Sequence, residues 1–285
     1  MADKRISELT ELVLPNAGTD VLAVVDTSTN KTKRATPKKL PMSDSAINHS
    51  YKYTTDIISG TIRTRNLTSI SETNGSYTND TNLTSIYMGG AVTSLGTKAF
   101  QGCTSLSEVV LPPNITSIGN YAFKNCTSLT SITIPERVNT IGSDAFYNCN
   151  GLTTITIPDT VRRIGATAFT DCSSLTSITI PNSVTSISFG AFSRCTSITT
   201  ATIGSSVGLI GQGCFQNCTS LARVDCLAKI APHLQSNNHF DNVLATEIHV
   251  PFGAKASYQN PFDEYANPLA GDGITYAGLI IIDDL

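Results

Sequence analysis

The sequence predicts a mainly β fold, a solenoid in which short repeats stack one on the next. Six cysteines recur at a spacing of 23 residues without a break, namely Cys103, Cys126, Cys149, Cys172, Cys195 and Cys218. A fixed period of this length, kept over more than a hundred residues, is typical of a solenoid whose repeats each contact only their neighbours. Function is therefore expected on the ladders of side chains that the repeats expose and on the segments that flank them.

Within each repeat, alternating apolar residues predict a short strand and a proline predicts its end. In the clearest copy, Ile132 and Ile134 flank one polar residue, which is the period of a half-buried strand. Pro135 then ends the strand, because proline cannot donate a hydrogen bond to a ladder. Val138 to Ile141 is a second short extended stretch, and Gly142 is expected to permit the sharp turn after it.

The pair Ala145-Phe146 completes this repeat and places one small and one large apolar side chain inside. Each coil buries its apolar residues only against its neighbours, at roughly the 4.8 Å spacing of adjacent strands. The equivalent phenylalanines are therefore expected to form a stacked aromatic column. Its members are Phe100, Phe123, Phe146, Phe169, Phe192 and Phe215.

All eight cysteines are predicted to lie in the interior. Besides the ladder, Cys214 takes the alanine position of its repeat and Cys226 takes the second isoleucine position of its strand. A free cysteine at such a site behaves as a small hydrophobe. Disulfides or a metal site are the alternatives, but no Cys-x-x-Cys pair occurs, and cytoplasmic synthesis would keep the thiols reduced. We therefore expect structural thiols, no metal and no cofactor.

The composition argues against several classes of function. Charged residues make up 14% of the chain, against about 25% in typical soluble proteins. The net charge of -3 offers no electrostatic footprint for nucleic acid, and no apolar run reaches the roughly 18 residues of a membrane span. The first residues lack the apolar core of a secretory signal, so export by that route is not expected. No phosphate-binding loop or nucleophile elbow occurs, so the protein is not expected to be an enzyme.

The repeat pattern carries a specific resemblance. Leu-x-x-Ile-x-Ile-Pro from Leu129, followed by Ile-Gly-x-x-Ala-Phe-x-x-Cys ending at Cys149, closely resembles the BspA-like, or treponemal-type, leucine-rich repeats. The resemblance covers about residues 81 to 226 and implies a leucine-rich-repeat solenoid. The segment 248–258 resembles the unit that often closes such arrays. Upstream, Asn66–Ile70 and Asn82–Ile86 are interpreted as repeat fragments of an irregular N-terminal cap.

The first 45 residues differ from the repeats. Val21 to Val25 is a short apolar strand between turn-forming residues, and Lys31 to Thr36 is expected to return as a second strand. The order Ile-Ser-Glu-Leu, Asp-Val-Leu-Ala-Val-Val-Asp and Thr-Lys-Arg-Ala-Thr over residues 5 to 40 is similar to the N-terminal segments of many bacteriophage tail-fibre and other virion appendage proteins. That resemblance implies attachment to a virion; the alternatives are an unstructured leader and a solenoid cap. The residues assigned to attachment are Ile6, Leu9, Val21, Leu22, Val24 and Val25.

These patterns divide the chain into four parts. Residues 1–45 are the virion-attachment segment, 46–80 a linker and irregular cap, 81–226 the solenoid, and 227–285 a C-terminal cap with a terminal strand. The strand-forming run Tyr276 to Ile282 would promote aggregation if left exposed, so we expect it to pair with the capping unit or with another copy of the chain.

The outward positions of the first strand form a candidate binding surface. In four successive repeats they carry only Ser and Thr, namely Ser131, Thr133, Thr154, Thr156, Ser177, Thr179, Thr200 and Thr202. Small β-branched hydroxyl residues also suit a solvated stacked strand, which is the simpler interpretation. Alternatively, hydroxyls in register form a recognition surface for sugar hydroxyls or a partner backbone. The Thr-x-Thr pattern also has a local resemblance to ice-binding solenoids.

Taken together, the sequence favours a non-enzymatic bacteriophage virion protein, a tail fibre or other appendage. Its N-terminus would dock on other virion proteins, and its repeats would bind a host cell-surface glycan or protein, or a neighbouring virion protein. Because such fibres are commonly trimers, a homo-oligomer is also expected. The alternatives are a BspA-like adhesin on the bacterial cell surface and a purely structural phage decoration protein.

Overall fold

The computed structural model describes two compact units, Met1–Ile47 and Asn48–Leu285. In the first it describes three strands; in the second it describes strands at 61–64 and 69–70, followed by residues 76–235, 238–245, 247–258, 275–276 and 279–285. In that described part of the chain, no helix is long and apolar enough to cross a membrane.

The N-terminal unit contains a small antiparallel sheet. Strand β2 (Leu22–Asp26) lies between β1 (Glu11–Val13) and β3 (Lys31–Ala35). Backbone pairing joins Val24 to Lys33 and Leu12 to Val24. The predicted strand and its return are confirmed, each within one residue at its ends. Strand β1 was not predicted, because three residues are too few to show an alternation.

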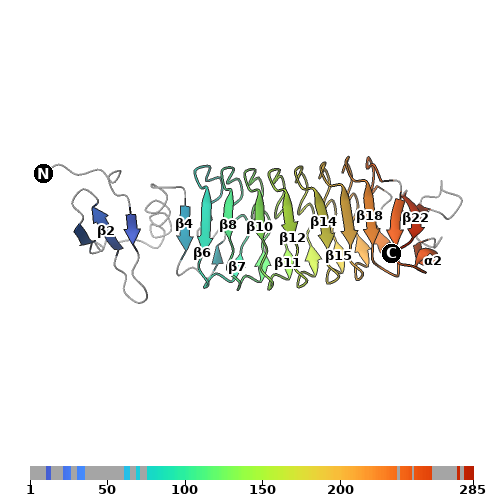
Figure 1. Cartoon of the computed structure of the whole chain (residues 1–285), viewed down its shortest axis with the longest axis horizontal. Helices are drawn as coiled ribbons and strands as arrows, with labels where there is room; N and C mark the ends of the chain where they lie inside the picture. The colour runs from blue at the N-terminus through green and yellow to red at the C-terminus, as the bar shows by residue number, and fades with distance from the viewer. Residues whose placement is uncertain are drawn as a thin grey trace. The chain divides into compact units, whose positions relative to one another are not determined.

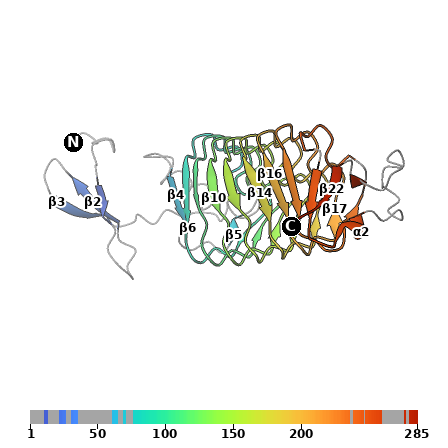
Figure 2. The ribbon, with the colours of Figure 1, turned by 45° about the vertical axis from the view of Figure 1, so that its right-hand side comes forward.

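The second unit is a solenoid with two rows of parallel strands (Figures 1 and 2). The first strand of each coil belongs to what we call the long-strand row. Its members are β4 (Thr61–Thr64), β6 (Ser85–Met88), β8 (Glu108–Val110), β10 (Ser131–Thr133), β12 (Thr154–Thr156), β14 (Ser177–Ile180), β16 (Thr200–Ile203), β18 (Arg223–Cys226), β20 (Glu247–Val250) and β22 (Leu279–Asp283). From β4 to β20 neighbouring strands of this row are about one repeat apart in sequence, and β22 follows β20 at 33 residues. The predicted leucine-rich-repeat solenoid is confirmed.

The second strand of each coil belongs to the short-strand row, a single sheet of eight two-residue strands. Its members are β5 (Ser69–Ile70), β7 (Ser94–Leu95), β9 (Ser117–Ile118), β11 (Thr140–Ile141), β13 (Arg163–Ile164), β15 (Ser186–Ile187), β17 (Leu209–Ile210) and β19 (His233–Leu234). The 23-residue period sets the register in both rows: Ile132 pairs with Ile155 and Ile141 with Ile164. Each residue type is thus repeated along the solenoid.

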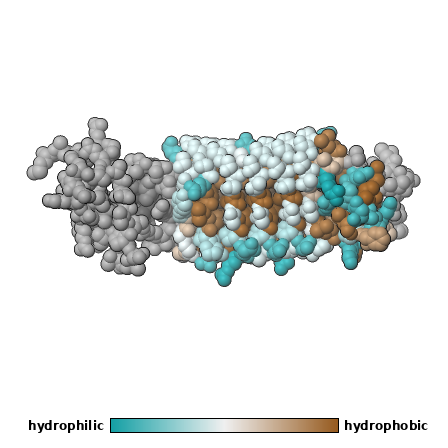
Figure 3. All heavy atoms as spheres, viewed as in Figure 1, coloured by the Kyte–Doolittle hydropathy of each residue, from teal (hydrophilic) through white to brown (hydrophobic). Residues whose placement is uncertain are grey.

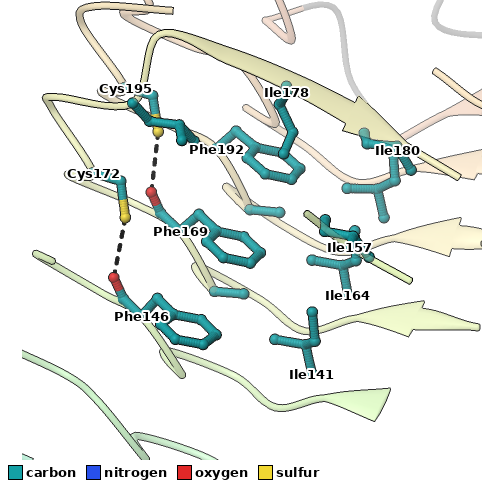
Figure 4. Close-up of a cluster of buried hydrophobic side chains, with 14 of the residues drawn as sticks. Ile141, Phe146, Ile157, Ile164, Phe169, Cys172, Ile178, Ile180, Phe192 and Cys195 are labelled. Atoms are coloured by element: carbon teal, nitrogen blue, oxygen red, sulfur yellow. Dashed lines mark hydrogen bonds between the residues drawn. The ribbon is translucent and has the colours of Figure 1, made fainter. Parts of the chain in front are cut away.

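The core is a column of aromatic rings flanked by aliphatic side chains (Figure 4). The six predicted phenylalanines stack, and Tyr77 and Phe240 extend the column at its two ends. Neighbouring ring centroids are 5.2 to 5.6 Å apart, with interplanar angles from 1° to 13°. All six predicted phenylalanines are fully buried, so the column is the largest apolar element that the coils share.

The cysteine ladder lies beside this column, and all eight cysteines are buried free thiols, as predicted. Their role is more specific than that of a small hydrophobe. Each thiol of the ladder donates a hydrogen bond of 2.9 to 3.2 Å to the carbonyl of the aromatic residue 26 positions earlier. Figure 4 shows this bond from Cys172 to Phe146 and from Cys195 to Phe169. The thiols therefore join one coil to the next.

Gly142 has a different role from the predicted one. Its φ is not in the left-handed region; the left-handed residues of that coil are Asp144 and Asn148. A Cβ at Gly142 would lie 2.6 Å from the backbone nitrogen of Asn120 and 2.7 Å from the carbonyl carbon of Gly119. Glycine is needed here because the backbone of the preceding coil leaves no room for a side chain.

The strand pairing shows which row each of the N-terminal repeat fragments joins. Ser69–Ile70 pairs with Ser94–Leu95 in the short-strand row, whereas Ser85–Ile86 belongs to the long-strand row. The fragments at 66–70 and 82–86 therefore occupy different positions in a coil. The motif is ambiguous because Asn114–Ile118, which leads into β9, carries the same Thr-Ser-Ile ending. The coil of β4 and β5 extends both strand rows upstream of residue 81.

The C-terminal strand pairs with other strands of the same unit. Strand β22 pairs in parallel with β20, and β21 (Thr275–Tyr276) adds to it in antiparallel fashion. This confirms the expectation that the terminal run pairs with the capping unit. Nearby, Tyr258 at the end of α2 (Lys255–Tyr258) is buried and its hydroxyl donates a hydrogen bond of 2.7 Å to the carbonyl of Ala228.

The glycine contacts make a direct prediction about stability. Gly142→Ala should destabilise the protein by about 1–3 kcal/mol, because its Cβ has to displace the backbone of the preceding coil. Gly208→Ala is the matched control, since a Cβ there meets only the Thr185 carbonyl oxygen at 3.9 Å. It should leave stability unchanged or raise it slightly. Urea unfolding checks both, and equal stability of the two variants would contradict the packing argument.

The buried thiols make a second prediction. Burial raises the pKa of the Cys149 and Cys172 thiols, so little of the reactive thiolate forms near neutral pH. A thiol reagent should label none of the eight cysteines of the native protein while it labels all eight in denaturant without reductant. Fewer than eight labelled thiols after unfolding would reveal a disulfide.

Candidate binding face

The eight Ser and Thr residues predicted from sequence lie together on the outer face of strands β10, β12, β14 and β16. We call this set the hydroxyl lattice. Strand pairing places Ser131 beside Thr154 and Thr133 beside Thr156. In the same way, Ser177 and Thr179 lie beside Thr200 and Thr202. Seven of the eight residues are exposed and Thr202 is partly exposed.

The hydroxyls of this lattice differ from those of the neighbouring threonines. Thr153, Thr176 and Thr199, which precede the same strands, each donate a hydrogen bond of 3.2 to 3.4 Å to the carbonyl one repeat earlier. Within the part of the chain that the structure describes, none of the eight lattice hydroxyls has a protein hydrogen-bond partner. Backbone pairing joins β10 to β12 and β14 to β16, and the lattice side chains are left for water or for a ligand.

Different chemistry flanks the lattice at its two ends. At the N-terminal end, Tyr87 of β6 pairs in register with Val110 of β8, whose side chain is 44% exposed, and Glu108 lies exposed on the same face. At the other end, Arg223 Nε lies 2.9 Å from Asp225 Oδ1. The hydrogen bond that Arg223 donates to the Asp225 carboxylate raises the pKa of Arg223. Figure 3 shows hydrophobic and near-neutral bands alternating along the array, and hydrophilic residues near its C-terminal end.

A second group of charged residues, on the turns beside the cysteine ladder, was missed in the sequence. Lys124 Nζ lies 2.9 Å from Asp144 Oδ1, 4.4 Å from the ring centre of Tyr147 and 5.1 Å from that of Tyr121. These residues lie next to the Ala-Phe pair, at positions whose residue type differs from one repeat to the next. The signal in the sequence was the charge at these positions, in an array that has few charged residues.

The same turns carry an ion pair between Asp171 and Arg194, with two Arg nitrogen to carboxylate oxygen distances of 2.6 Å. Hydrogen bonding from Arg194 lowers the pKa of the Asp171 carboxyl. Asn148 also donates a hydrogen bond of 3.0 Å to Asn125 in the preceding coil. All of these contacts join adjacent coils, so the group braces the turns, and its charges are already paired with one another.

The residues assigned to virion attachment are only partly described. Leu22, Val24 and Val25 belong to β2. Ile6, Leu9 and Val21 lie outside the described residues. Their assignment therefore stays a prediction.

The described residues contain no group of three or more His, Cys, Asp and Glu placed to hold a metal ion. Burial raises the pKa of the Cys126 and Cys195 thiols, which disfavours the thiolate that a nucleophile requires. The hydroxyl lattice is, among the described residues, an extended surface whose side-chain hydroxyls have no protein partner. Its hydroxyls can accept and donate hydrogen bonds, which suits non-covalent recognition.

Comparison with solved structures agrees with this fold. A leucine-rich-repeat protein of Treponema pallidum has 26% sequence identity and a TM-score of 0.52, over 56% of this chain and 77% of that one. A leucine-rich cell surface protein of Faecalibacterium prausnitzii has 23% identity and a TM-score of 0.57, over 84% of this chain and 71% of that one. Both relatives are bacterial, and neither supports the resemblance to virion appendages. A comparison with curated proteins finds no match.

One protein-family model matches most of the chain. The model of the BspA-type leucine-rich-repeat region matches in six copies over residues 45–164 and 139–266. These matches contain every regular coil from β6 to β19 and the β20 strand. The resemblance found in the repeat motif is thereby confirmed, and the chain belongs to the BspA-type leucine-rich-repeat family.

Proposed function

We propose that this protein is a non-enzymatic recognition protein of the bacterial cell surface, an adhesin that contacts its partner through the hydroxyl lattice. Membership of the BspA-type family and the likeness to a bacterial cell surface protein support the location. The observation that carries the choice of face is the contrast between bonded and unbonded hydroxyls. Thr153 and Thr176 use their hydroxyls to join coils, whereas Thr156 and Thr179 leave theirs unpaired by any described residue.

The lattice is also physically suited to binding. Its side chains are short, and each rises from a strand held on both sides by neighbouring coils, so binding immobilises few rotatable bonds. The β-branched threonines have a restricted χ1 angle, which lowers that cost further. An extended row of coils presents many weak contacts to one elongated partner, as solenoids commonly do.

A virion appendage is the second candidate. It is supported by the resemblance of residues 5 to 40 and by the division of the chain into two compact units, of which Met1–Ile47 is the first. Antibodies against the solenoid separate the two candidates. Labelling of intact bacteria without phage induction supports the surface protein, and labelling confined to purified particles supports the appendage.

Binding should be lost when charge is placed on the lattice. The triple variant Thr133→Lys, Thr156→Lys and Thr179→Lys should reduce binding of the labelled protein to cells and extracellular matrix at least tenfold, because three ammonium groups interrupt the neutral face. Flow cytometry and plate binding measure this effect. The control carries Ser117→Lys, Thr140→Lys and Ser186→Lys on the short-strand row and should bind like the wild type. Equal binding by both triple variants would refute the assignment of the face.

The contrast between the two sets of hydroxyls is itself testable. Replacing Thr133, Thr156 and Thr179 by Val should change the free energy of unfolding by less than about 0.5 kcal/mol, as at exposed sites without partners. Replacing Thr153, Thr176 and Thr199 by Val should cost about 1–2 kcal/mol, because three hydrogen bonds between coils are lost. Urea unfolding compares the two sets, and a larger loss for the lattice set would show that its hydroxyls serve the fold.

A further inference from the structure

The chemistry at the N-terminal end of the lattice indicates what kind of partner the face accepts. Tyr87 and Val110 lie side by side in register, one an aromatic ring and the other an apolar side chain that is 44% exposed. Glu108 is exposed on the same strand as Val110, and its carboxylate has no ion pair in the described part of the chain. An aromatic and apolar surface beside an available carboxylate suits a ligand with both C–H and hydroxyl groups.

The patch formed by Tyr87, Glu108 and Val110, which we call the corner, is continuous with the hydroxyl lattice. Strands β8 and β10 lie in contact, as Figure 1 shows, so Val110 is followed along the outer face by Thr133 and then Thr156. The lattice itself carries no charge on any of its eight residues. Charge reappears only beyond β16, where Arg223 and Asp225 already pair with each other. A strongly charged polymer would thus find no complementary charge over the four central strands.

The distance between adjacent coils further restricts the kind of partner that fits the face. Equivalent groups of adjacent coils are 5.2 to 5.6 Å apart at the aromatic column, and strands pair at about 4.8 Å. An extended chain of pyranose sugars repeats its rings at nearly this interval. Successive sugars could therefore present equivalent hydroxyls to successive coils, and each serine or threonine hydroxyl both donates and accepts.

We propose that the face binds a neutral polysaccharide that lies along the solenoid axis, with one sugar ring on the corner of Tyr87 and Val110. Glu108 accepts hydrogen bonds from hydroxyls of that sugar, and the lattice holds the sugars that follow. This inference rests on the proposed use of the lattice as the contact face and names the chemistry of its partner.

Native gel electrophoresis of the full chain tests the proposal. The gels contain a neutral β-glucan, galactomannan or xylan, or one of the anionic polymers pectate and hyaluronan. At least one neutral polymer should retard the protein, and the anionic polymers should not. Oligosaccharides of that neutral polymer should bind more tightly with each added sugar until they span the corner and the four lattice strands. Retardation by none of the neutral polymers, or by the anionic ones alone, would overturn the proposal.

Substitutions locate the binding. Tyr87→Ala should weaken binding at least tenfold and Tyr87→Phe should preserve it, because the ring and not the hydroxyl forms the platform. The triple variant Thr133→Val, Thr156→Val and Thr179→Val should also weaken binding at least tenfold, while circular dichroism shows an unchanged fold. The control Ser117→Ala, Thr140→Val and Ser186→Ala on the short-strand row should bind normally. Normal binding by the lattice variant would place the sugar elsewhere.

The two proposals can fail separately. If the lysine variant of the lattice loses cell binding but the protein binds no polysaccharide, the face serves a protein partner and only the inference is wrong. If polysaccharide binding depends on Tyr87 but cells are bound equally by all variants, the adhesive role of the face is wrong while its ligand chemistry stands.

Discussion

Each coil of this solenoid can bury its apolar residues only against the next coil, so every coil has to stack at the spacing of hydrogen-bonded strands. Three features of the repeat meet this constraint. The phenylalanine rings stack at 5.2 to 5.6 Å, and the glycines leave the backbones free to approach. The carbonyl of Phe146 accepts hydrogen bonds both from the Cys149 amide of its own coil and from the Cys172 thiol of the next.

The same constraint determines how the exposed side chains are arranged on the surface. Because the register cannot slip without exposing the core, outward residues of successive coils are held in fixed rows. A row with the same kind of side chain in every coil, such as Ser and Thr, forms a regular lattice. A row whose side chains differ from coil to coil forms separate local contacts. The long-strand row is of the first kind from β10 to β16, and the turns beside the cysteine ladder are of the second kind. The hydroxyls of the first have no protein partner among the described residues, and the second braces the coils through pairs such as Lys124 with Asp144.

Much of the architecture was predictable from the sequence, because the period of 23 residues shows which residues occupy the same position in successive coils. The two strands of each coil, the aromatic column and the interior cysteines all followed from the alternation of apolar residues around Ile132 and Phe146. The candidate lattice was predictable for the same reason, since outward positions are known once inward ones are. The row to which Ser69–Ile70 belongs was not predicted, because its motif occurs in both rows and only strand pairing decides between them.

The sequence by itself determined the repeat, its core and the positions that face outward, because all three depend on periodicity alone. Only the tertiary structure decided which hydroxyls are used by the fold, since Thr153 and Thr156 look alike in sequence. It also assigned Gly142 to close backbone contact instead of to a turn, because that distance arises between residues of different coils. Contacts between coils join residues about 23 positions apart, and no local pattern records how closely they approach.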